Sequence, residues 1–237
     1  MHVAIPILHN RPQAAVATFD AGTLGYQAAW EMQLDFHQRV CTGELPGGML
    51  MLVEHPPTIT IGRHPGAHRH LLASPAMLSS RQVEVVETDR GGDITFHGPG
   101  QLVVYPIIPL NSYSLKLHDY MRLMEQAVMD VLARFGVAGQ RSAGATGVWV
   151  EGRDGMAAAK ICAMGIKLRR WVSLHGLALN VSTDLSYFDL INPCGLGRPV
   201  TSLAALLGEQ TPTMARVKAE MVNQFRMALL NRPVQHT

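Results

Sequence analysis

Cysteine, aromatic residues and charge are all scarce in this chain of 237 residues. It has three cysteines, 6% aromatic residues and 16% charged residues. Three scattered cysteines are too few for a disulfide framework, and the first residues lack the features of a secretory signal, so we expect a cytoplasmic location. Lys and Arg outnumber Asp and Glu by only 20 to 18, which gives no electrostatic basis for nucleic-acid binding. No apolar run reaches about 18 residues, so no transmembrane helix is expected.

The apolar content is high enough for a substantial core. It amounts to 47% of the residues, and we expect one domain over residues 1–237. Helical patterns cover residues 24–40, 115–135, 201–207 and 213–230, and strand patterns cover 49–55, 83–87, 101–108, 147–151, 158–168 and 174–181. Asp20 or Thr23 is the expected cap of the first helix, and Pro106 predicts an edge or a bulge. Strict alternation of strand and helix is absent, which favours an α+β fold.

Residues 90–101 (RGGDITFHGPGQ) hold four glycines and one proline. A backbone of this kind can approach a ligand closely. Arg90 and His97 offer hydrogen-bond donors, while Ile94 and Phe96 offer apolar surface. Composition alone is equally typical of a tight surface hairpin, and the GxxxxGK[ST] spacing of a phosphate-binding loop is missing.

Two residues have the chemistry of a covalent site. Cys194 lies in the turn-like sequence NPCG (192–195), and its free thiol, which titrates near about 8.5, needs a nearby cation to be nucleophilic at neutral pH. Lys160 lies among small apolar residues, where burial is costly without a partner; strand alternation could instead place it on the solvent face. Cys162, in the same apolar run, is expected to pack as a small hydrophobic residue.

The histidines leave several interpretations open. Residues 173–180 (SLHGLALN) alternate small and apolar side chains, as a pocket wall does, and His175 could be a site residue, a buried structural histidine or an edge contact. His64, His68 and His70 lie close together in sequence, but no carboxylate or cysteine stands at ligand spacing beside them. We interpret these three as surface histidines and expect no metal.

Six segments in this order resemble the lipoyl(octanoyl) transferases, the octanoyl-[acyl-carrier-protein]–protein N-octanoyltransferases of lipoate biosynthesis. The segments are 55–63 (HPPTITIGR), 90–107 (RGGDITFHGPGQLVVYPI), 147–150 (GVWV), 160–170 (KICAMGIKLRR), 175–181 (HGLALNV) and 191–195 (INPCG). The resemblance extends over roughly residues 26–207. Asp93 stands where the family more often has glutamine, Phe96 where tyrosine is usual, and Met164 where leucine is common.

The resemblance implies a fold and an activity. The fold is related to that of lipoate- and biotin-protein ligases, with a central mixed, largely antiparallel sheet flanked by helices. The activity is the transfer of an octanoyl group from acyl carrier protein to a lysine of lipoyl domains. The implied acceptors belong to 2-oxoacid dehydrogenase complexes and to the glycine cleavage H protein. No cofactor and no nucleic acid take part.

The resemblance also assigns roles to residues. It implies that Cys194 carries the acyl group as a thioester and that Lys160 lowers the pKa of this cysteine. The implied substrate-binding residues are Arg90, Gly91, Gly92, Asp93, Ile94, Thr95, Phe96, His97, Ala163, Met164, Gly165, Gly176, Leu177 and Ala178. We expect the acyl tunnel to be apolar, built around Met164, Leu177 and Leu179.

Two other functions compete with the transferase. An ATP-dependent lipoate- or biotin-protein ligase would use the same fold and a lysine like Lys160, but it would not need a nucleophile at Cys194. A non-catalytic module that binds acyl carrier protein or lipoyl domains would keep the pocket and tolerate Cys194→Ser.

Overall fold

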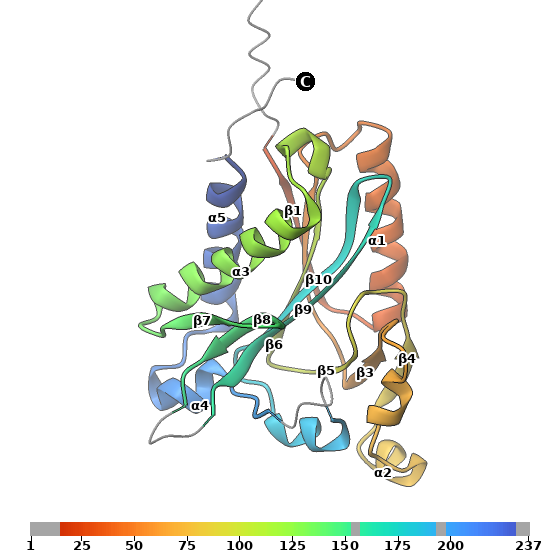
Figure 1. The fold of residues 1–237 in the computed structure, drawn as a ribbon, viewed down its shortest axis with the longest axis vertical. Coiled ribbons are helices and arrows are strands. Elements are labelled where there is room, and N and C mark those ends of the chain that lie inside the picture. Colours follow the sequence, from red (N-terminus) through yellow and green to blue (C-terminus); the bar gives the residue numbers. More distant parts are fainter. Residues whose placement is uncertain (1–14, 153–156, 193–197, 231–237) are drawn as a thin grey trace, which may run out of the picture.

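The computed structural model describes residues 15–152, 157–192 and 198–230 (Figure 1). Within these residues a seven-stranded sheet has the order β1-β2-β6-β10-β9-β8-β7 and a three-stranded sheet has the order β4-β3-β5. The strands are β1 (Ala17–Thr23), β2 (Met49–Glu54), β3 (Thr58–Ile61), β4 (Glu84–Glu87), β5 (Ile94–His97), β6 (Gln101–Ile107), β7 (Gly139–Ser142), β8 (Ala145–Val150), β9 (Ala159–Arg169) and β10 (Val172–Asn180). The helices are α1 (Tyr26–Cys41), α2 (Pro75–Ser80), α3 (Leu117–Arg134), α4 (Leu203–Leu207) and α5 (Met214–Leu230), with 3-10 turns η1 (Ala67–His70), η2 (Leu110–Tyr113), η3 (Leu185–Leu190) and η5 (Gly208–Gln210).

Both sheets are mixed. β1 pairs with β2 in parallel and β3 pairs with β4 in parallel, whereas the other named pairs are antiparallel. This arrangement confirms the expected α+β fold with a largely antiparallel sheet. No helix in the described part of the chain is both long and apolar enough to cross a membrane.

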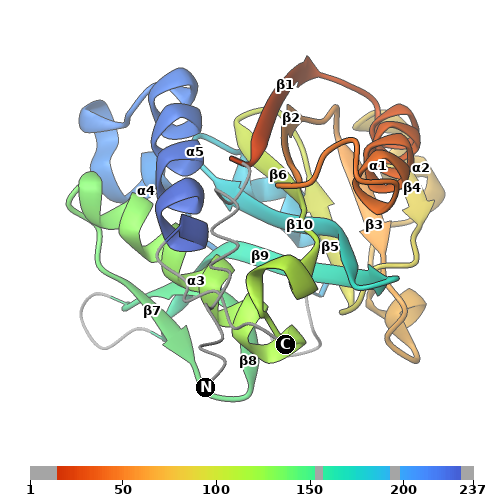
Figure 2. The same ribbon diagram turned by 90° about the horizontal axis from the view of Figure 1, so that it is seen from above.

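Helices cover both faces of the larger sheet. Figures 1 and 2 show α3 and α5 on one side of it and α1 on the other. The continuous apolar sequence of β2 follows from this layering, because a strand buried on both faces has no solvent side. Leu50 and Leu52 pack in the core that includes α3 and α5, and Met49 and Met51 pack in the core that includes α1.

Two local expectations were wrong. Asp20 and Thr23 do not cap α1, because both lie in β1, and the helix begins after Gly25. Pro106 lies in an interior strand. Leu50 of β2 pairs with Pro106, but the carbonyl and nitrogen of Pro106 face β10, and the β10–β6 ladder ends at Val104, before the proline, so the missing N–H costs no ladder bond. The side chain of Ser173 instead donates to the carbonyl of Pro106 (2.6 Å).

Candidate active site

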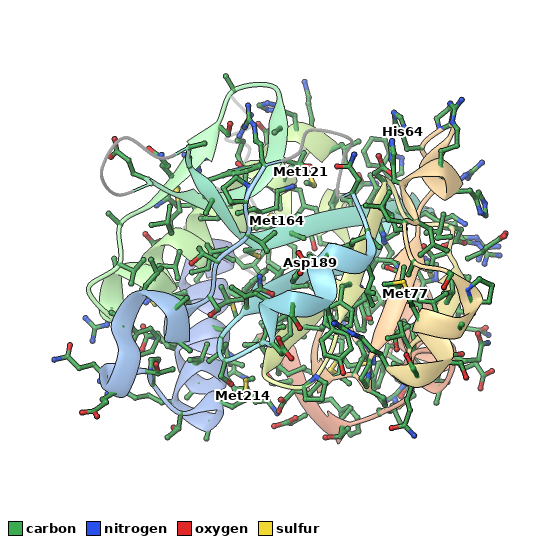
Figure 3. All side chains as sticks on the ribbon, turned by 90° about the horizontal axis from the view of Figure 1, so that it is seen from below. His64, Met77, Met121, Met164, Asp189 and Met214 are labelled. Atoms are coloured by element: carbon green, nitrogen blue, oxygen red, sulfur yellow. The ribbon has the colours of Figure 1, made fainter. Side chains whose placement is uncertain are left out.

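A cavity lies between the β9–β10 hairpin and the glycine-rich residues 90–97. The residues of the predicted set that line it are Arg90, Gly92, Asp93, Ile94, Thr95, His97, Lys160, Ala163, Met164, Gly165, Gly176, Leu177 and Ala178. The sequence therefore identified much of the wall of one cavity. Figure 3 shows Met164 near the middle of the molecule in that view.

Small residues form the floor of this cavity. Ala163 pairs with Ala178 across the hairpin, and Gly165 pairs with Gly176. A Cβ atom on Gly165 would lie 2.5 Å from the carbonyl oxygen of Gly91. A side chain at position 165 would therefore push the glycine-rich segment off the strand, which explains the glycine there.

Two predicted residues and one expected tunnel residue do not belong to this lining. Gly91 donates its N–H to the carbonyl of Ile166 (2.9 Å) and so holds the glycine-rich segment on β9. Phe96 is buried in the core of the smaller sheet, where its ring stacks on Tyr187 at 4.7 Å between centroids. Leu179 packs in the main core beside α3 and α5 and does not line the cavity, although Leu177 on the same face of β10 does.

Further lining residues were not predicted as site residues. They are Tyr26, Gln101, Val103, Tyr105, Thr146, His175, Asn180, Phe188 and Val200. Gln101 and Asn180 stand inside or beside the segments that carry the resemblance, and that proximity was an available signal. Tyr26 comes from α1, and only the tertiary fold brings it to the cavity.

A chain of hydrogen bonds between uncharged side chains fixes one wall. His97 Nδ1 donates to Gln101 Oε1 (2.8 Å), and Gln101 Nε2 donates to Asn180 Oδ1 (2.9 Å). Asn180 Nδ2 then donates to the carbonyl of Thr201 (2.9 Å). Burial lowers the pKa of His97 to about 3, so its ring is neutral near neutral pH. Its Nε2 can accept from the hydroxyl of Thr60 (3.2 Å).

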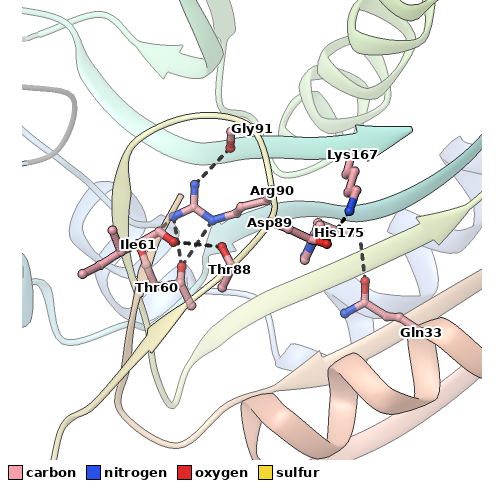
Figure 4. A network of polar contacts seen from close by, with 9 residues as sticks. All are labelled: Gln33, Thr60, Ile61, Thr88, Asp89, Arg90, Gly91, Lys167 and His175. Atoms are coloured by element: carbon pink, nitrogen blue, oxygen red, sulfur yellow. Dashed lines mark hydrogen bonds and ion pairs between the residues drawn. The ribbon is translucent and has the colours of Figure 1, made fainter. Parts of the chain in front are cut away.

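The side chain of Arg90 connects the glycine-rich segment to β3 (Figure 4). Its guanidinium donates to the carbonyl of Thr60 (2.7 Å), to the Thr60 hydroxyl and to the carbonyl of Gly91 (3.1 Å). The side chain is buried, and these bonds join β3 to the start of the cavity wall.

Asp89 fastens the same segment to the β9–β10 hairpin (Figure 4). Its Oδ1 lies 2.7 Å from His175 Nε2 and its Oδ2 lies 2.5 Å from Lys167 Nζ. Burial works to raise the pKa of Asp89, but the hydrogen bonds from Lys167 and His175 outweigh it and lower that pKa below its ordinary value. His175 is therefore both a buried partner of Asp89 and a lining residue of the cavity.

His175 is held in an unusual backbone conformation. Its φ is +58°, in the left-handed region that favours glycine. Its N–H donates to Gln33 Oε1 on α1 (2.9 Å). Burial is the main cause that lowers the pKa of the imidazole below its ordinary value.

Lys160 is half-buried in the cavity wall, not on a solvent face. Its Nζ lies 4.7 Å from the centre of the Trp149 ring, a cation–π contact. Its backbone N–H donates to the carbonyl of Pro199 (2.9 Å), and its carbonyl accepts from the N–H of Thr201 (2.9 Å). Arg198 lies over the Trp149 ring as well, at 5.0 Å from its centre.

Cys194 lies outside the described residues. The described residues nearest to it in sequence are Asn192, whose N–H donates to the carbonyl of His70 (2.8 Å), and Arg198, which donates to Ser142 Oγ (2.7 Å). Cys162 is fully buried, and burial raises the pKa of its thiol well above the ordinary value. It packs as a small hydrophobic residue, as expected.

Three histidines, His64, His68 and His70, lie in the turn η1 or just before it. No group of three or more His, Cys, Asp or Glu in the described part of the chain is placed to hold a metal ion. The side chains of His64 and His68 are exposed, and Figure 3 shows His64 at the rim of the molecule. His70 differs from them, because its Nδ1 lies 2.8 Å from the Asp93 carboxylate.

Comparisons with known proteins match most of the chain. Residues 25–226 match the lipoyl protein ligase A/B catalytic domain family. An octanoyltransferase of Chloroflexus aurantiacus is 50% identical over 206 residues, which cover 86% of this chain and 89% of that protein. An octanoyltransferase of Gloeobacter violaceus is 48% identical over 188 residues, or 79% of each chain. A bipartite lipoate protein ligase of Thermoplasma acidophilum shares the fold, with a TM-score of 0.68 at 15% identity over 91% of this chain and 84% of that chain.

Proposed function

This chain belongs to the lipoyl protein ligase A/B catalytic domain family, and we propose that it transfers an octanoyl group to protein in lipoate biosynthesis. Its relatives at 50% and 48% identity are octanoyltransferases, so the chain is an acyltransferase. The structural observation that best supports this function is the cavity with a floor of small residues and with Lys160 in its wall. Such a cavity can hold a slender acyl chain beside a cation.

The proposed reaction has two steps. In the first, the Cys194 thiolate attacks the carbonyl carbon of an acyl thioester; a new thioester forms, and the donor thiolate leaves and takes up a proton. In the second, the amine of a target lysine attacks the Cys194 thioester, an amide forms, and Cys194 is released. The first step exchanges one thioester for another and needs no ATP. The second is downhill because an amide is more stable than a thioester.

Lys160 supplies the cation that this scheme needs. An ammonium group near a thiol favours the thiolate and lowers its pKa. The backbone of Lys160 is bonded on both sides to residues 199 and 201, which follow Cys194 in sequence by five and seven positions. This pairing supports the proposed partnership, because it links the lysine to the segment that continues from the cysteine.

The cavity is proposed to bind the octanoyl chain. Ala163, Gly165, Gly176 and Ala178 leave room above the hairpin. Met164 and Leu177 also line the cavity, and they belong to the face of the hairpin that packs in the main core. Each methylene removed from water contributes on the order of 0.8 kcal/mol, so burial alone favours a longer chain until the wall is reached.

Octanoyl-acyl carrier protein is the proposed donor. Lipoyl domains of 2-oxoacid dehydrogenase complexes and the glycine cleavage H protein are the proposed acceptors. We expect these reactions to take place in the cytoplasm, because a nucleophilic thiol has to stay reduced. We expect them to need no cofactor.

Intact mass spectrometry tests the covalent step. The protein is mixed with octanoyl-acyl carrier protein without ATP, and we expect one octanoyl adduct that hydroxylamine removes and that Cys194→Ala lacks. Transfer of octanoate without any adduct on the wild type would exclude the covalent scheme. A requirement for ATP would indicate the ligase alternative, and binding without transfer would indicate the non-catalytic module.

The role of Lys160 has its own test. Lys160→Ala is expected to slow acylation strongly at neutral pH and to regain part of the rate at high pH, where the thiol ionises without help. The measurement is the rate of adduct formation as a function of pH. An acylation defect that is equal at all pH values would remove the proposed role of the ammonium group.

A further inference from the structure

His70 connects two segments that the proposed reaction must hold in register. Its ring reaches the glycine-rich segment, where Nδ1 lies 2.9 Å from Asp93 Oδ1 and 2.8 Å from Asp93 Oδ2. Its main chain reaches the other segment, where its carbonyl accepts from the N–H of Asn192 (2.8 Å). Asp93 lines the cavity, and Asn192 is the last described residue before Cys194. One residue therefore contacts both the acyl cavity and the approach to the predicted nucleophile.

The carboxylate of Asp93 offers His70 a fixed partner. Only 7% of its side chain is exposed, and its Oδ1 also accepts from the N–H of Ile94 (2.7 Å), at the start of β5. His64 approaches Oδ2 less closely, with Nδ1 at 3.9 Å, and its side chain is 58% exposed. The His70 side chain is only 25% exposed, so its contact with Asp93 is both shorter and more buried than that of His64.

The connection between η1 and residues 190–192 extends beyond a single bond. The N–H groups of Leu72 and Ala73 both donate to the carbonyl of Leu190 (2.9 and 3.1 Å). Leu71 and Ile191 form an isolated antiparallel bridge. Residues 70–73 therefore run alongside 190–192, so that the position of His70 and the position of this part of the chain are coupled.

We propose that His70 is a positioning residue, which sets the segment leading to Cys194 against the acyl cavity by anchoring η1 to Asp93. The proposal rests on the proposed function, since it assumes that Cys194 is the nucleophile. The ring does not react; it fixes the relative position of the groups that do. Misplacement of reacting groups by about 1 Å can cost roughly a hundredfold in rate even when binding is intact.

The geometry predicts a particular kinetic signature. The cavity wall is held to the β9–β10 hairpin by contacts that do not involve His70. Gly91 is bonded to Ile166, and Asp89 is bonded to His175 and Lys167. Loss of the His70 ring should therefore leave binding of the acyl donor nearly unchanged. The loss should instead lower the rate at saturating donor, because the approach to Cys194 is no longer held at the correct place.

The test compares three variants of the full chain. His70→Ala removes the ring, and His70→Asn keeps an N–H donor close to the position of Nδ1. His68→Ala is the matched control, because His68 lies in the same turn with a 64% exposed side chain and faces Glu87. For each protein, the rate of octanoyl adduct formation is measured against the concentration of octanoyl-acyl carrier protein, together with the unfolding temperature.

We expect His70→Ala to lower the rate at saturating donor by roughly tenfold to a hundredfold, with the half-saturating concentration within about twofold of wild type. His70→Asn should recover most of the rate, and His68→Ala should match wild type. A wild-type rate in His70→Ala overturns the proposal. So does a defect confined to the half-saturating concentration, or a defect of equal size in His70→Asn and His70→Ala. Should the wild type form no adduct at all, the proposed function itself fails.

Discussion

Two histidine–carboxylate pairs lie at the two ends of residues 89–93, where the glycine-rich segment begins, and they differ in which partner is buried. At one end the imidazole of His175 is 1% exposed and the carboxylate of Asp89 is 34% exposed. At the other end the imidazole of His70 is 25% exposed and the carboxylate of Asp93 is 7% exposed. The first pair ties the segment to the β9–β10 hairpin, and the second ties it to the η1 turn.

The difference indicates that Asp89 and Asp93 have different structural roles, although only three residues separate them in sequence. Asp89 has two partners, and the neighbouring Gly91–Ile166 bond adds a third connection to the hairpin. Near Asp93 the main chain is bonded to the residues that follow β3, because the N–H groups of Gly62 and His64 donate to the carbonyls of Asp93 and Gly92 (both 3.1 Å). The link from this end to η1 depends mainly on the side chain of His70. Several connections suit the wall of a cavity, whereas a link through one side chain suits an alignment that affects rate more than stability. Each prediction below tests one part of this comparison.

The largest expected effect concerns the histidines that have no carboxylate partner. His55 and His97 are bonded to neutral groups, and burial lowers their pKa values from 6.5 to about 4 and about 3. Each takes up a proton more readily when the chain is unfolded, so the stability they contribute is present above pH 6.5 and is lost as the pH falls toward 4. As the pH falls from 6.5 toward 4, each of these two histidines should lower the free energy of unfolding by about 1.4 kcal/mol per pH unit.

Urea unfolding between pH 7 and pH 4 measures this slope, within the range marked by the pKa shifts. His97→Gln removes one of the two histidines, each of which binds a proton on unfolding. It should therefore reduce the slope of the free energy of unfolding against pH by about 1.4 kcal/mol per pH unit. His118→Gln, at an exposed position on α3, controls for the loss of an imidazole. A slope unchanged by His97→Gln would mean that His97 is not neutral in the folded protein.

Gly165→Ala should displace the glycine-rich segment from β9 near Asp89, although it changes none of the residues of the two histidine–carboxylate pairs. The added methyl would lie 2.5 Å from the carbonyl of Gly91, so the segment has to move away from β9. We expect octanoyl adduct formation to slow by roughly a hundredfold, because the cavity wall moves with it. Gly25→Ala is the control, since nothing lies within 4 Å of a Cβ atom there. Full activity in Gly165→Ala would show that this end of the segment adapts easily.

Much of the fold was predictable from local pattern, and the exceptions have physical causes. α1, α3 and α5 follow from helical periodicity, and the β9–β10 hairpin follows from two apolar runs around a short turn. β1 was missed because its sequence, ATFDAGT, has one large apolar residue, Phe19, between two alanines, and because its parallel pairing with β2 is a tertiary contact. β5 was missed because glycines on both sides of Ile94–His97 are typical of a loop.

The candidate site was predictable to a similar extent, for a different reason. The resemblance located the glycine-rich segment, Lys160 and the small residues of the hairpin, and these line one cavity. It could not distinguish Phe96 from the lining residues, although Phe96 faces the core of the smaller sheet. Nor could sequence spacing distinguish His70 from His64 and His68, because only the course of the chain through η1 brings His70 within hydrogen-bond distance of Asp93, while His64 stays 3.9 Å away.

Asp89→Ala should have the next largest effect and should act on stability. It removes the partner of the buried His175 Nε2, and a buried polar group left without a partner costs about 1–2 kcal/mol at a site that is partly open to solvent. Urea unfolding measures the loss. Glu87→Ala is the matched control, because Glu87 is 78% exposed beside His68 and should change stability by less than about 0.5 kcal/mol. Equal losses in the two variants would contradict a structural role for the Asp89–His175 pair.

The smallest effect is expected for Lys167→Ala, which leaves the Asp89–His175 bond in place. Lys167 and Asp89 are each about one-third exposed, and ion pairs of this kind contribute less than about 1 kcal/mol and weaken with added salt. The loss on Lys167→Ala should therefore be smaller than the loss on Asp89→Ala, and it should shrink further in about 1 M salt. Losses of the same size in both variants would assign the anchor to the lysine. The buried imidazole would then contribute nothing beyond filling space, and the contrast between the two histidine pairs would rest on His70 alone.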